Sequence, residues 1–599
     1  MKTMAPVLLG AWLLLPALPA PALSQPAPNL LQEASQRFHP VVSGGGMVAA
    51  QEARAAAVGA AVLRRGGNAV DAAVATSYAL AVTLPQAGNL GGGGFLVLWL
   101  PRRTGLPQAL SLGRGEAVAV NFREMAPGAA RPDLFLKPDG TVDRERATRS
   151  LLSTAVPGTV AGLNLVQRRY GRLPLQVVLQ PAIELAERGF PVGAELSASL
   201  RAAAPLLKAD PTSARLFFRP DGSSYRPGEI LRQPLLAATL RRIAVHGEAG
   251  FYRGPVARSL TGLMQQRGGL IRQSDLDGYR AQWMRPLQGR FRGYQVLTMP
   301  PPSGGGVTLI QLLQVLEPLD LAATGLNSAA TIHRMVEAMN LAYRDRNRLL
   351  GDPDQVAMPL DRLLSRGYAD QQRQRLNLMR HRPAAELEAE PSPAGGGVNT
   401  THVSVVDRDG GLVATTTTLN TAYGNGISVP GAGFLLNNEM DDFTAKPGAA
   451  NAYGLRQGDQ NAIAPGRRPL SSMTPTLVFR ADGRPLLATG SPGGSRIITT
   501  VLQVLLNRLL HGLNLASAVA APRIHSQLWP DQISIEEGIS ADTQRLLEAM
   551  GHRLVPVPAM GSANSVEVRY RESGGPSPSG SLGAADPRRL DAAAVPERL

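Results

Sequence analysis

The segment Asn399-Thr400-Thr401-His402 places a hydroxyl group at the start of a predicted β-hairpin. A glycine-rich stretch precedes it, and alternating apolar residues predict strands over 401–406 and 412–419, joined by a turn. If the chain cut itself before Thr400, that residue would supply a nucleophilic hydroxyl and, in its new α-amino group, a base. Taken alone, the segment is also consistent with an ordinary polar strand start.

A second cluster of polar residues, Asn437-Asn438-Glu439-Met440-Asp441-Asp442-Phe443, follows a predicted strand over 433–436. Its carboxylates could bind an ammonium group through charge-assisted hydrogen bonds. A capped turn is the structural alternative. Glycoside hydrolysis would need a matching second acidic site, which does not stand out. A metal site would need more histidines than the single His402.

Two further segments could hold a carboxylate. The hydroxyl-rich turn 467–475 contains Ser471 and Ser472 and enters a predicted strand, although capping of the turn would use the same residues. In the segment 121–127, Arg123 stands at a strand end before a proline. Its guanidinium group can pair with a carboxylate through two bonds, or it can form a purely structural ion pair.

The loop Thr489-Gly490-Ser491-Pro492-Gly493-Gly494-Ser495-Arg496 joins a predicted strand over 485–488 to a helix over about 497–510. Adjacent glycines allow backbone N–H groups to approach a ligand closely, and the helix N-terminus adds partial positive charge. This geometry suits an oxyanion hole. A phosphate cradle is the rival, but neither a P-loop motif nor the G-x-S-x-G motif of serine hydrolases is present.

The periodicity of apolar residues predicts strand-rich zones in the two halves of the chain, with helices around them. We expect the two zones to pack into one sheet sandwich covered by helices. The segment from 573 onward is rich in Gly, Ser and Pro and is predicted to be loose. Further predicted elements are helices over 49–64 and 68–84, strands over 95–100 and 116–122, and a mainly helical region over 150–290.

The first residues have the pattern of a secretory signal peptide, predicted to span 1–24. A basic start, an apolar stretch over 7–15 and small residues near a cleavage point define it. No other run of about 18 apolar residues appears, so we expect no membrane anchor and a location in the bacterial periplasm or the medium. Cysteine is absent, which excludes disulfides and thiol nucleophiles.

The chain of 599 residues is 44% hydrophobic and carries a net charge of +15, almost entirely from arginine. The arginines are scattered and no nucleic-acid recognition motif accompanies them, so we expect no nucleic-acid partner.

Together and in this order, the motifs resemble the γ-glutamyltransferase family of N-terminal nucleophile hydrolases. The resemblance extends from about Gly44 to Asp586-Pro587-Arg588. It implies a four-layer αββα sandwich of the α/β (α+β) class. It also implies a precursor that cuts itself into a large subunit, residues 25–399, and a small subunit, residues 400–599, which together form one αββα unit.

The resemblance assigns roles residue by residue. Cleavage after Asn399 would expose Thr400 as the nucleophile, and Thr418 would hydrogen-bond to it. The other implied groups are an oxyanion hole (Gly493, Gly494), ligands of the substrate α-carboxylate (Arg123, Ser471, Ser472), ligands of its α-amino group (Asn420, Glu439, Asp442) and a lid loop over 447–458 with Tyr453. No metal or cofactor is implied.

The implied activity is cleavage of γ-glutamyl amides such as glutathione through a γ-glutamyl ester of Thr400, followed by transfer to water, an amino acid or a peptide. A cephalosporin or glutaryl acylase of the same fold is the first alternative. Retention of Arg123, Asp442, Ser471 and Ser472 argues against it. An uncleaved periplasmic protein that binds γ-glutamyl compounds is the second alternative.

Overall fold

The computed structural model describes residues 38–102, 105–388, 400–571, 575 and 577–598. The predicted signal peptide and Asn399, the residue before the predicted cleavage point, lie outside the described residues. Among the residues described, no helix is long and apolar enough to cross a membrane.

The predicted hairpin at Thr400 forms the centre of the first large sheet. Its two strands are antiparallel, with Thr401 opposite Thr417. Strands from both halves of the chain surround the hairpin. The strand order is β20 (Ala593–Pro596), β2 (Met47–Ala50), β11 (Thr401–Val406), β12 (Leu412–Thr418), β3 (Gly93–Leu100), β5 (Gly115–Phe122) and β4 (Leu110–Leu112), and β8 (Gln282–Met284) pairs with β5.

The second large sheet also mixes the two halves of the chain. Its strand order is β1 (Val41–Ser43), β19 (Pro578–Ala584), β18 (Ser565–Tyr570), β14 (Pro485–Thr489), β13 (Thr476–Phe479), β10 (Tyr294–Thr298) and β9 (Leu287–Phe291). Two small sheets lie outside this pair: β6 (Phe190–Pro191) with β7 (Ile230–Leu231), and β15 (Ile524–His525) with β16 (Ile533–Glu536) and β17 (Leu554–Val557).

Side chains of the first sheet are buried on both faces, as expected when each face is covered. Along β3, Leu96 and Leu98 belong to the core shared with one set of helices, whereas Val97 and Trp99 belong to the core shared with the second sheet. The alternation along one strand therefore divides the interior into two cores, one on each side of the sheet.

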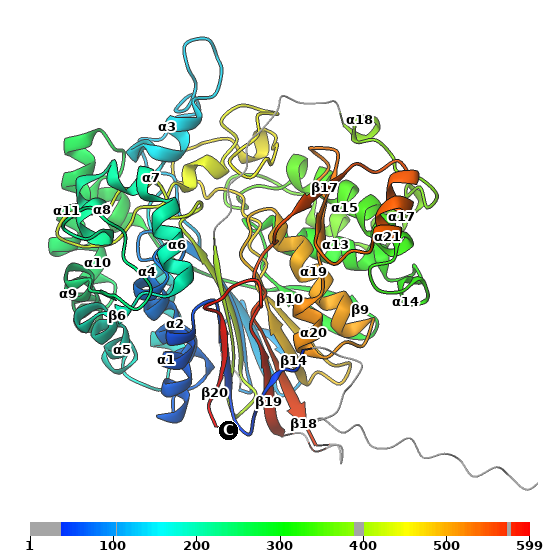
Figure 1. Cartoon of the computed structure of the whole chain (residues 1–599), viewed down its shortest axis with the longest axis horizontal. Coiled ribbons are helices and arrows are strands. Elements are labelled where there is room, and N and C mark those ends of the chain that lie inside the picture. Colours follow the sequence, from blue (N-terminus) through cyan, green and yellow to red (C-terminus); the bar gives the residue numbers. More distant parts are fainter. Residues whose placement is uncertain (1–37, 103–104, 389–399, 572–574, 576, 599) are drawn as a thin grey trace, which may run out of the picture. The chain divides into compact units, whose positions relative to one another are not determined.

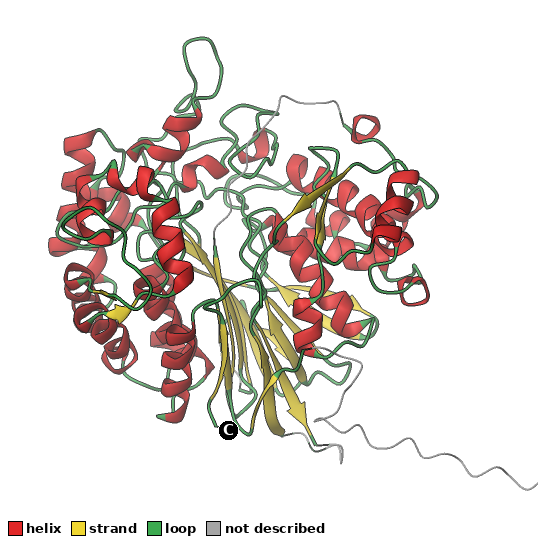
Figure 2. Ribbon diagram, in the orientation of Figure 1, coloured by secondary structure: helices red, strands yellow, loops and turns green. Residues whose placement is uncertain are grey.

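Helices cover the outer face of each sheet (Figures 1 and 2). On the first sheet lie α1 (Ala53–Arg64), α2 (Ala69–Thr83), α4 (Thr159–Tyr170), α5 (Leu175–Arg188), α6 (Ala194–Ala202), α7 (Ala204–Lys208), α8 (Pro211–Phe217), α9 (Pro234–His246), α10 (Ala249–Tyr252), α11 (Gly254–Arg267) and α12 (Gln273–Gly278). On the second lie α13 (Gly304–Leu316), α14 (Leu321–Thr324), α15 (Ala329–Leu349), α16 (Leu360–Leu363), α17 (Arg366–Gln374), α19 (Arg496–Leu509), α20 (Leu515–Ala520) and α21 (Ala541–Ala549). The predicted four-layer αββα sandwich is thus confirmed.

Three short elements frame the open end of the sandwich: α3 (Arg144–Arg149), α18 (Ala384–Leu387) and a 3₁₀ turn over the acidic motif (Glu439–Asp442). Two further 3₁₀ turns span Leu151–Ser153 and Asp459–Asn461.

Local signals located α2 correctly. Asn68 caps it by accepting from the N–H of Asp71, whose side chain in turn accepts from the N–H of Asn68. This reciprocal pair is a capping box and satisfies two N–H groups that the helix leaves unpaired.

Three sequence predictions are wrong. Ala49 and Ala50 belong to strand β2 rather than to the start of the helix predicted over 49–64, because pairing with β11 and β20 overrides the helix propensity of alanine. The segment after 573 is not loose throughout: β19 pairs with β18 and β1, and β20 pairs with β2. Residues 433–436 form only isolated bridges at Leu435 and Leu436.

Candidate active site

Ten of the residues proposed from sequence line one hollow at the open end of the sandwich. They come from the end of β12, from the residues next to β5 and β11, from the acidic turn, from the segment 447–458, and from the loops after β12, before β13 and after β14. They are Arg123, Thr400, Thr418, Asn420, Glu439, Asp442, Tyr453, Ser471, Ser472 and Gly494. Gly493 is not among the lining residues, although it precedes Gly494 directly.

The hairpin register places the two threonines side by side. Thr400 stands directly before β11 and Thr418 ends β12, so the pairing of Thr401 with Thr417 puts them opposite each other. Thr400 Oγ1 donates to Thr418 Oγ1 at 3.3 Å, and Thr418 Oγ1 also accepts from the N–H of Asn420 at 2.9 Å. Both threonines are buried. The Thr400 hydroxyl is therefore held in a fixed position at the floor of the hollow.

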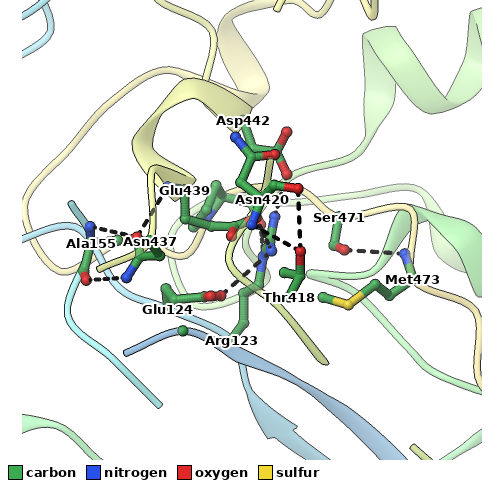
Figure 3. Close-up of polar contacts among 12 residues, drawn as sticks. Arg123, Glu124, Ala155, Thr418, Asn420, Asn437, Glu439, Asp442, Ser471 and Met473 are labelled. Atoms are coloured by element: carbon green, nitrogen blue, oxygen red, sulfur yellow. Dashed lines mark hydrogen bonds and ion pairs between the residues drawn. The ribbon is translucent and has the colours of Figure 1, made fainter. Parts of the chain in front are cut away.

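Arg123 lies at the centre of a buried charge cluster (Figure 3). Its Nη1 donates to Glu439 Oε1, its Nη2 donates to Asp442 Oδ2 at 2.5 Å, and its Nε donates to the carbonyl of Pro469 at 3.1 Å. We expected this cation and these acids to face each other across a substrate. Instead they are in direct contact, and the carboxylates supply the counter-charge that a buried guanidinium group needs.

The acids around Arg123 have perturbed protonation equilibria. Burial raises the pKa of the Glu439 carboxyl well above its usual range, although Arg123 opposes this effect. Burial likewise raises the pKa of the neighbouring Glu124 to about 7, again against Arg123. Burial by itself would lower the pKa of Arg123, but the surrounding acids hold it above its usual range. Three carboxyl groups thus share one guanidinium group in this buried cluster.

Two acceptor atoms at the hollow are buried and have no hydrogen-bond partner among the described residues: Asn420 Oδ1 and Glu439 Oε2. Asn420 Nδ2 donates to the carbonyl of Asn438 at 2.9 Å, which fixes the amide. Buried polar atoms without partners are costly. A ligand with N–H donors, such as an ammonium group, would satisfy both atoms.

A second arginine, which the sequence reading missed, stands beside the serines. Arg346, on α15, donates through Nη2 to Ser472 Oγ at 2.9 Å and through Nη1 to Gln457 Oε1 at 3.1 Å. It is buried, and burial lowers its pKa to about 10. Its Nε has no hydrogen-bond partner, and no carboxylate pairs with it, within the described part of the chain. The residues around Arg346 form an ordinary long polar helix, and nothing in their pattern identifies Arg346 as a site residue.

Ser471 lies next to Ser472 on the loop that enters β13. Its Oγ accepts from the N–H of Met473 at 3.1 Å, and its backbone pairs with residues at the start of α13. The hydroxyl hydrogen of Ser471 remains available to an anionic ligand. The two serines and Arg346 therefore form a donor-rich wall suited to a carboxylate.

The glycine loop and the lid segment meet over the hollow. Gly493 and Gly494 have φ angles of +134° and +57°, which favour glycine. A Cβ atom at Gly494 would lie 2.2 Å from the ring of Tyr453, so the ring packs directly on this glycine. The Tyr453 hydroxyl donates to the carbonyl of Asn420. Tyr453 thus bridges the glycine loop and the end of the nucleophile hairpin.

Comparison with known proteins agrees with this geometry. A family model described as gamma-glutamyltranspeptidase matches residues 55–595. This chain belongs to the gamma-glutamyltranspeptidase family. The match includes every site residue named above.

Individual relatives extend over nearly the whole chain. The chain is 44% identical to the glutathione hydrolase proenzyme of Escherichia coli (strain K12), covering 95% of each chain, and 43% identical to that of Pseudomonas sp. (strain A14), covering 92% of this chain and 94% of the relative. Among solved structures, the crystal structure of cephalosporin acylase from Bacillus halodurans superimposes with a TM-score of 0.79 at 26% identity, covering 97% of this chain and 99% of the acylase. Members of the gamma-glutamyltranspeptidase family and an acylase thus share this sandwich.

Proposed function

We propose that this protein is a glutathione hydrolase and γ-glutamyltransferase that works through the Thr400 hydroxyl. The observation that carries the proposal is the charge pattern around that hydroxyl. Two acceptor atoms, Asn420 Oδ1 and Glu439 Oε2, lie in the same hollow as the buried Arg346. Among the described residues, neither acceptor has a hydrogen-bond partner and Arg346 pairs with no carboxylate. This pattern complements the α-carbon zwitterion of a γ-glutamyl group.

The proposed reaction starts with the bound γ-glutamyl amide. Asp442, Glu439 and Asn420 would hold the α-ammonium group, while Arg123, Arg346 and the serines would hold the α-carboxylate. Thr400 Oγ attacks the γ-carbonyl carbon, and the α-amine of Thr400 takes the hydroxyl proton and passes it to the leaving nitrogen. The amide C–N bond breaks, and a γ-glutamyl ester remains on Thr400.

The second half of the reaction releases the ester. Water attacks the ester carbonyl and gives glutamate, or the amine of an amino acid or peptide attacks and gives a new γ-glutamyl amide. In each tetrahedral intermediate, the N–H groups of Gly493 and Gly494 would stabilise the negative oxygen. These ligands bind the α-ammonium and α-carboxylate groups, which lie away from the reacting γ-amide bond. They therefore contribute to catalysis by orienting the substrate.

The α-amine exists only after cleavage, so we propose that the precursor cuts itself before Thr400. Thr400 Oγ would attack the carbonyl of Asn399, the amide would become an ester, and water would open it. The products would be a large subunit over 25–399 and a small subunit over 400–599. Both large sheets contain hydrogen-bonded strands of both segments, so the two subunits would remain together as a heterodimer.

We propose a periplasmic or secreted location because of the signal-peptide pattern over 1–24. An acylase is the competing activity, since the cephalosporin acylase structure shares the fold. The residues around Arg123 favour a γ-glutamyl donor, because a glutaryl group lacks the α-amine and would leave Asp442 and Glu439 facing an empty position. A site that hydrogen-bonds a polar group can reject the analogue that lacks it by about 10⁴-fold or more.

The deciding experiment compares matched γ-glutamyl and glutaryl anilides, and glutathione, with and without a dipeptide acceptor. We expect kcat/KM for γ-glutamyl donors to be greater by roughly 10²-fold or more. Equal values, or a preference for glutaryl donors, would move the protein to the acylase class. N-terminal sequencing of the small chain should begin Thr-Thr-His-Val, and Thr400→Ala should remain one uncut, inactive chain. A single-chain wild type that binds γ-glutamyl compounds without turnover would indicate a binding protein.

A further inference from the structure

Two adjacent residues of the proposed lid, residues 447–458, donate hydrogen bonds to carboxylates of the acidic motif. Asn451 Nδ2 donates to Asp442 Oδ1 at 2.9 Å, and the N–H of Ala452 donates to Asp441 Oδ2 at 2.8 Å. We propose that Asn451 is a positioning residue that orients the Asp442 carboxylate for the substrate α-ammonium group and so sets the preference for donors with an α-amine. This inference rests on the proposed function.

Asp442 is the most exposed acid of the cluster. Its side chain is 11% exposed, whereas those of Glu439 and Glu124 are 1% and 0% exposed. Asp442 Oδ2 accepts from Arg123, and Oδ1 accepts from Asn451. A carboxylate has about four acceptor positions, so both oxygens retain capacity for an ammonium group.

The bond from Asn451 prevents a competing arrangement. An arginine and a carboxylate favour a pair of parallel hydrogen bonds, and the terminal torsion of aspartate is broad. Without Asn451, the Asp442 carboxylate would turn both oxygens toward Arg123 and present less of its charge to the hollow. With Asn451 in place, Oδ1 is directed toward the lid and away from the guanidinium group.

Asn451 is itself held rigidly. Its Oδ1 accepts from the N–H groups of Tyr453 at 3.0 Å and Leu455 at 3.1 Å, which directs its Nδ2 toward Asp442. The Asn451 side chain is buried. One amide therefore ties the fold of the lid to the orientation of the acid.

The backbone of Asp442 is fixed by other residues. Gln457 Nε2 and Asn461 Nδ2 donate to its carbonyl at 3.0 Å and 2.6 Å. These bonds do not involve Asn451. Removal of the Asn451 side chain should therefore release the carboxylate of Asp442 without moving its backbone.

The test measures kcat and KM for matched γ-glutamyl and glutaryl anilides with the mature enzyme. Asn451→Ala should raise KM for the γ-glutamyl donor by about ten- to a hundredfold, the effect expected for a hydrogen bond to a charged group. The glutaryl donor has no α-amine, so its kcat/KM should change by less than about threefold. The ratio of the two kcat/KM values should therefore fall by at least about tenfold.

Two further variants separate positioning from general damage to the lid. Asn451→Ser keeps a hydroxyl that can accept from lid N–H groups but is too short to reach Asp442, so it should lower the ratio as Asn451→Ala does. Gly448→Ala strains a lid turn with φ +75°, contacts neither acid and forms no hydrogen bond to Asn451, so it should change both donors by the same factor.

The outcomes distinguish this inference from the proposed function. A wild-type enzyme that uses both donors equally would overturn both. A wild-type enzyme that prefers γ-glutamyl donors, with Asn451 variants that are cut normally and keep the wild-type ratio, would overturn only the role of Asn451.

Discussion

Arg123 and Asp442 form a direct ion pair at the open end of the sandwich, with Nη2 2.5 Å from Oδ2. The cation proposed for the substrate α-carboxylate and an acid proposed for the α-amine are thus paired directly with each other in this structure. A γ-glutamyl zwitterion carries both charges and can give each partner a new counter-charge. Substrate binding would replace the buried ion pairs with new buried ion pairs and would leave no charge without a partner. This exchange limits the desolvation cost of binding.

Removal of either Arg123 or Asp442 should impair turnover of γ-glutamyl donors but leave self-cleavage of the precursor largely intact. We expect Arg123→Ala and Asp442→Ala each to lower kcat/KM by more than about tenfold, since an unpaired buried charge costs about 2–5 kcal/mol. Self-cleavage should persist because that reaction does not use the substrate ligands. Arg131, an exposed arginine paired with Asp133, provides the control: Arg131→Ala should leave kcat/KM unchanged. Near-normal efficiency in both site variants would refute the assigned roles.

Arg346 should show opposite effects on stability and activity. It is a buried cation with no carboxylate partner in the described residues, so Arg346→Met, which retains a long side chain, should leave Tm unchanged or raise it. The same change removes the donor to Ser472 Oγ and should lower kcat/KM for γ-glutamyl donors by about tenfold or more. Thermal unfolding and kinetics on the same preparation test this prediction. A large fall in Tm would show that Arg346 is mainly structural.

Gly494→Ala should displace the lid. The added Cβ would meet the Tyr453 ring at 2.2 Å, and φ at this position is +57°. We expect KM for γ-glutamyl donors to rise and limited proteolysis within 447–458 to become faster. If the clash is the cause, Tyr453→Ala and Gly494→Ala should be clearly non-additive in a double-mutant cycle. Additive effects would point to the strained backbone instead.

His381 should make stability depend on pH. Its ring bridges Glu337 at 3.2 Å and Asp531 at 2.9 Å, which places it between the proposed large and small subunits. Burial by itself lowers the pKa of His381, but hydrogen bonds and charges from Asp531 and Glu337 raise it to about 9. The nearby His333 and His552 have pKa values lowered by burial and remain neutral at this pH.

Because the pKa of His381 is higher in the folded protein than in the unfolded chain, the free energy of unfolding should fall as pH rises. The contribution of His381 is complete below its unfolded pKa of about 6.5 and is lost as pH rises through about 9. Between pH 7.5 and 10 the free energy of unfolding should fall by about 2 kcal/mol. His381→Asn should flatten this part of the Tm-against-pH curve. Parallel curves for the two proteins would show that other groups control alkaline unfolding.

The sequence by itself determined the motifs and much of the local structure. The hairpin after Thr400, the capped helix α2 and the loop before α19 were predictable because short-range chemistry controls them: period-two alternation, a capping box and adjacent glycines. The order of these motifs was enough to indicate the family.

Only the tertiary structure decided which partners each group has. The alanine-rich residues 47–50 and the Gly- and Ser-containing strand β19 are strands because distant strands pair with them, as Val41 does with Gly583, and this pairing outweighs weak local propensity. Arg346 and Asn451 gave no local signal, since their roles depend on contacts with Ser472 and Asp442. Charges and hydrogen-bond partners at the site are set by packing between remote segments, which a one-dimensional pattern does not encode.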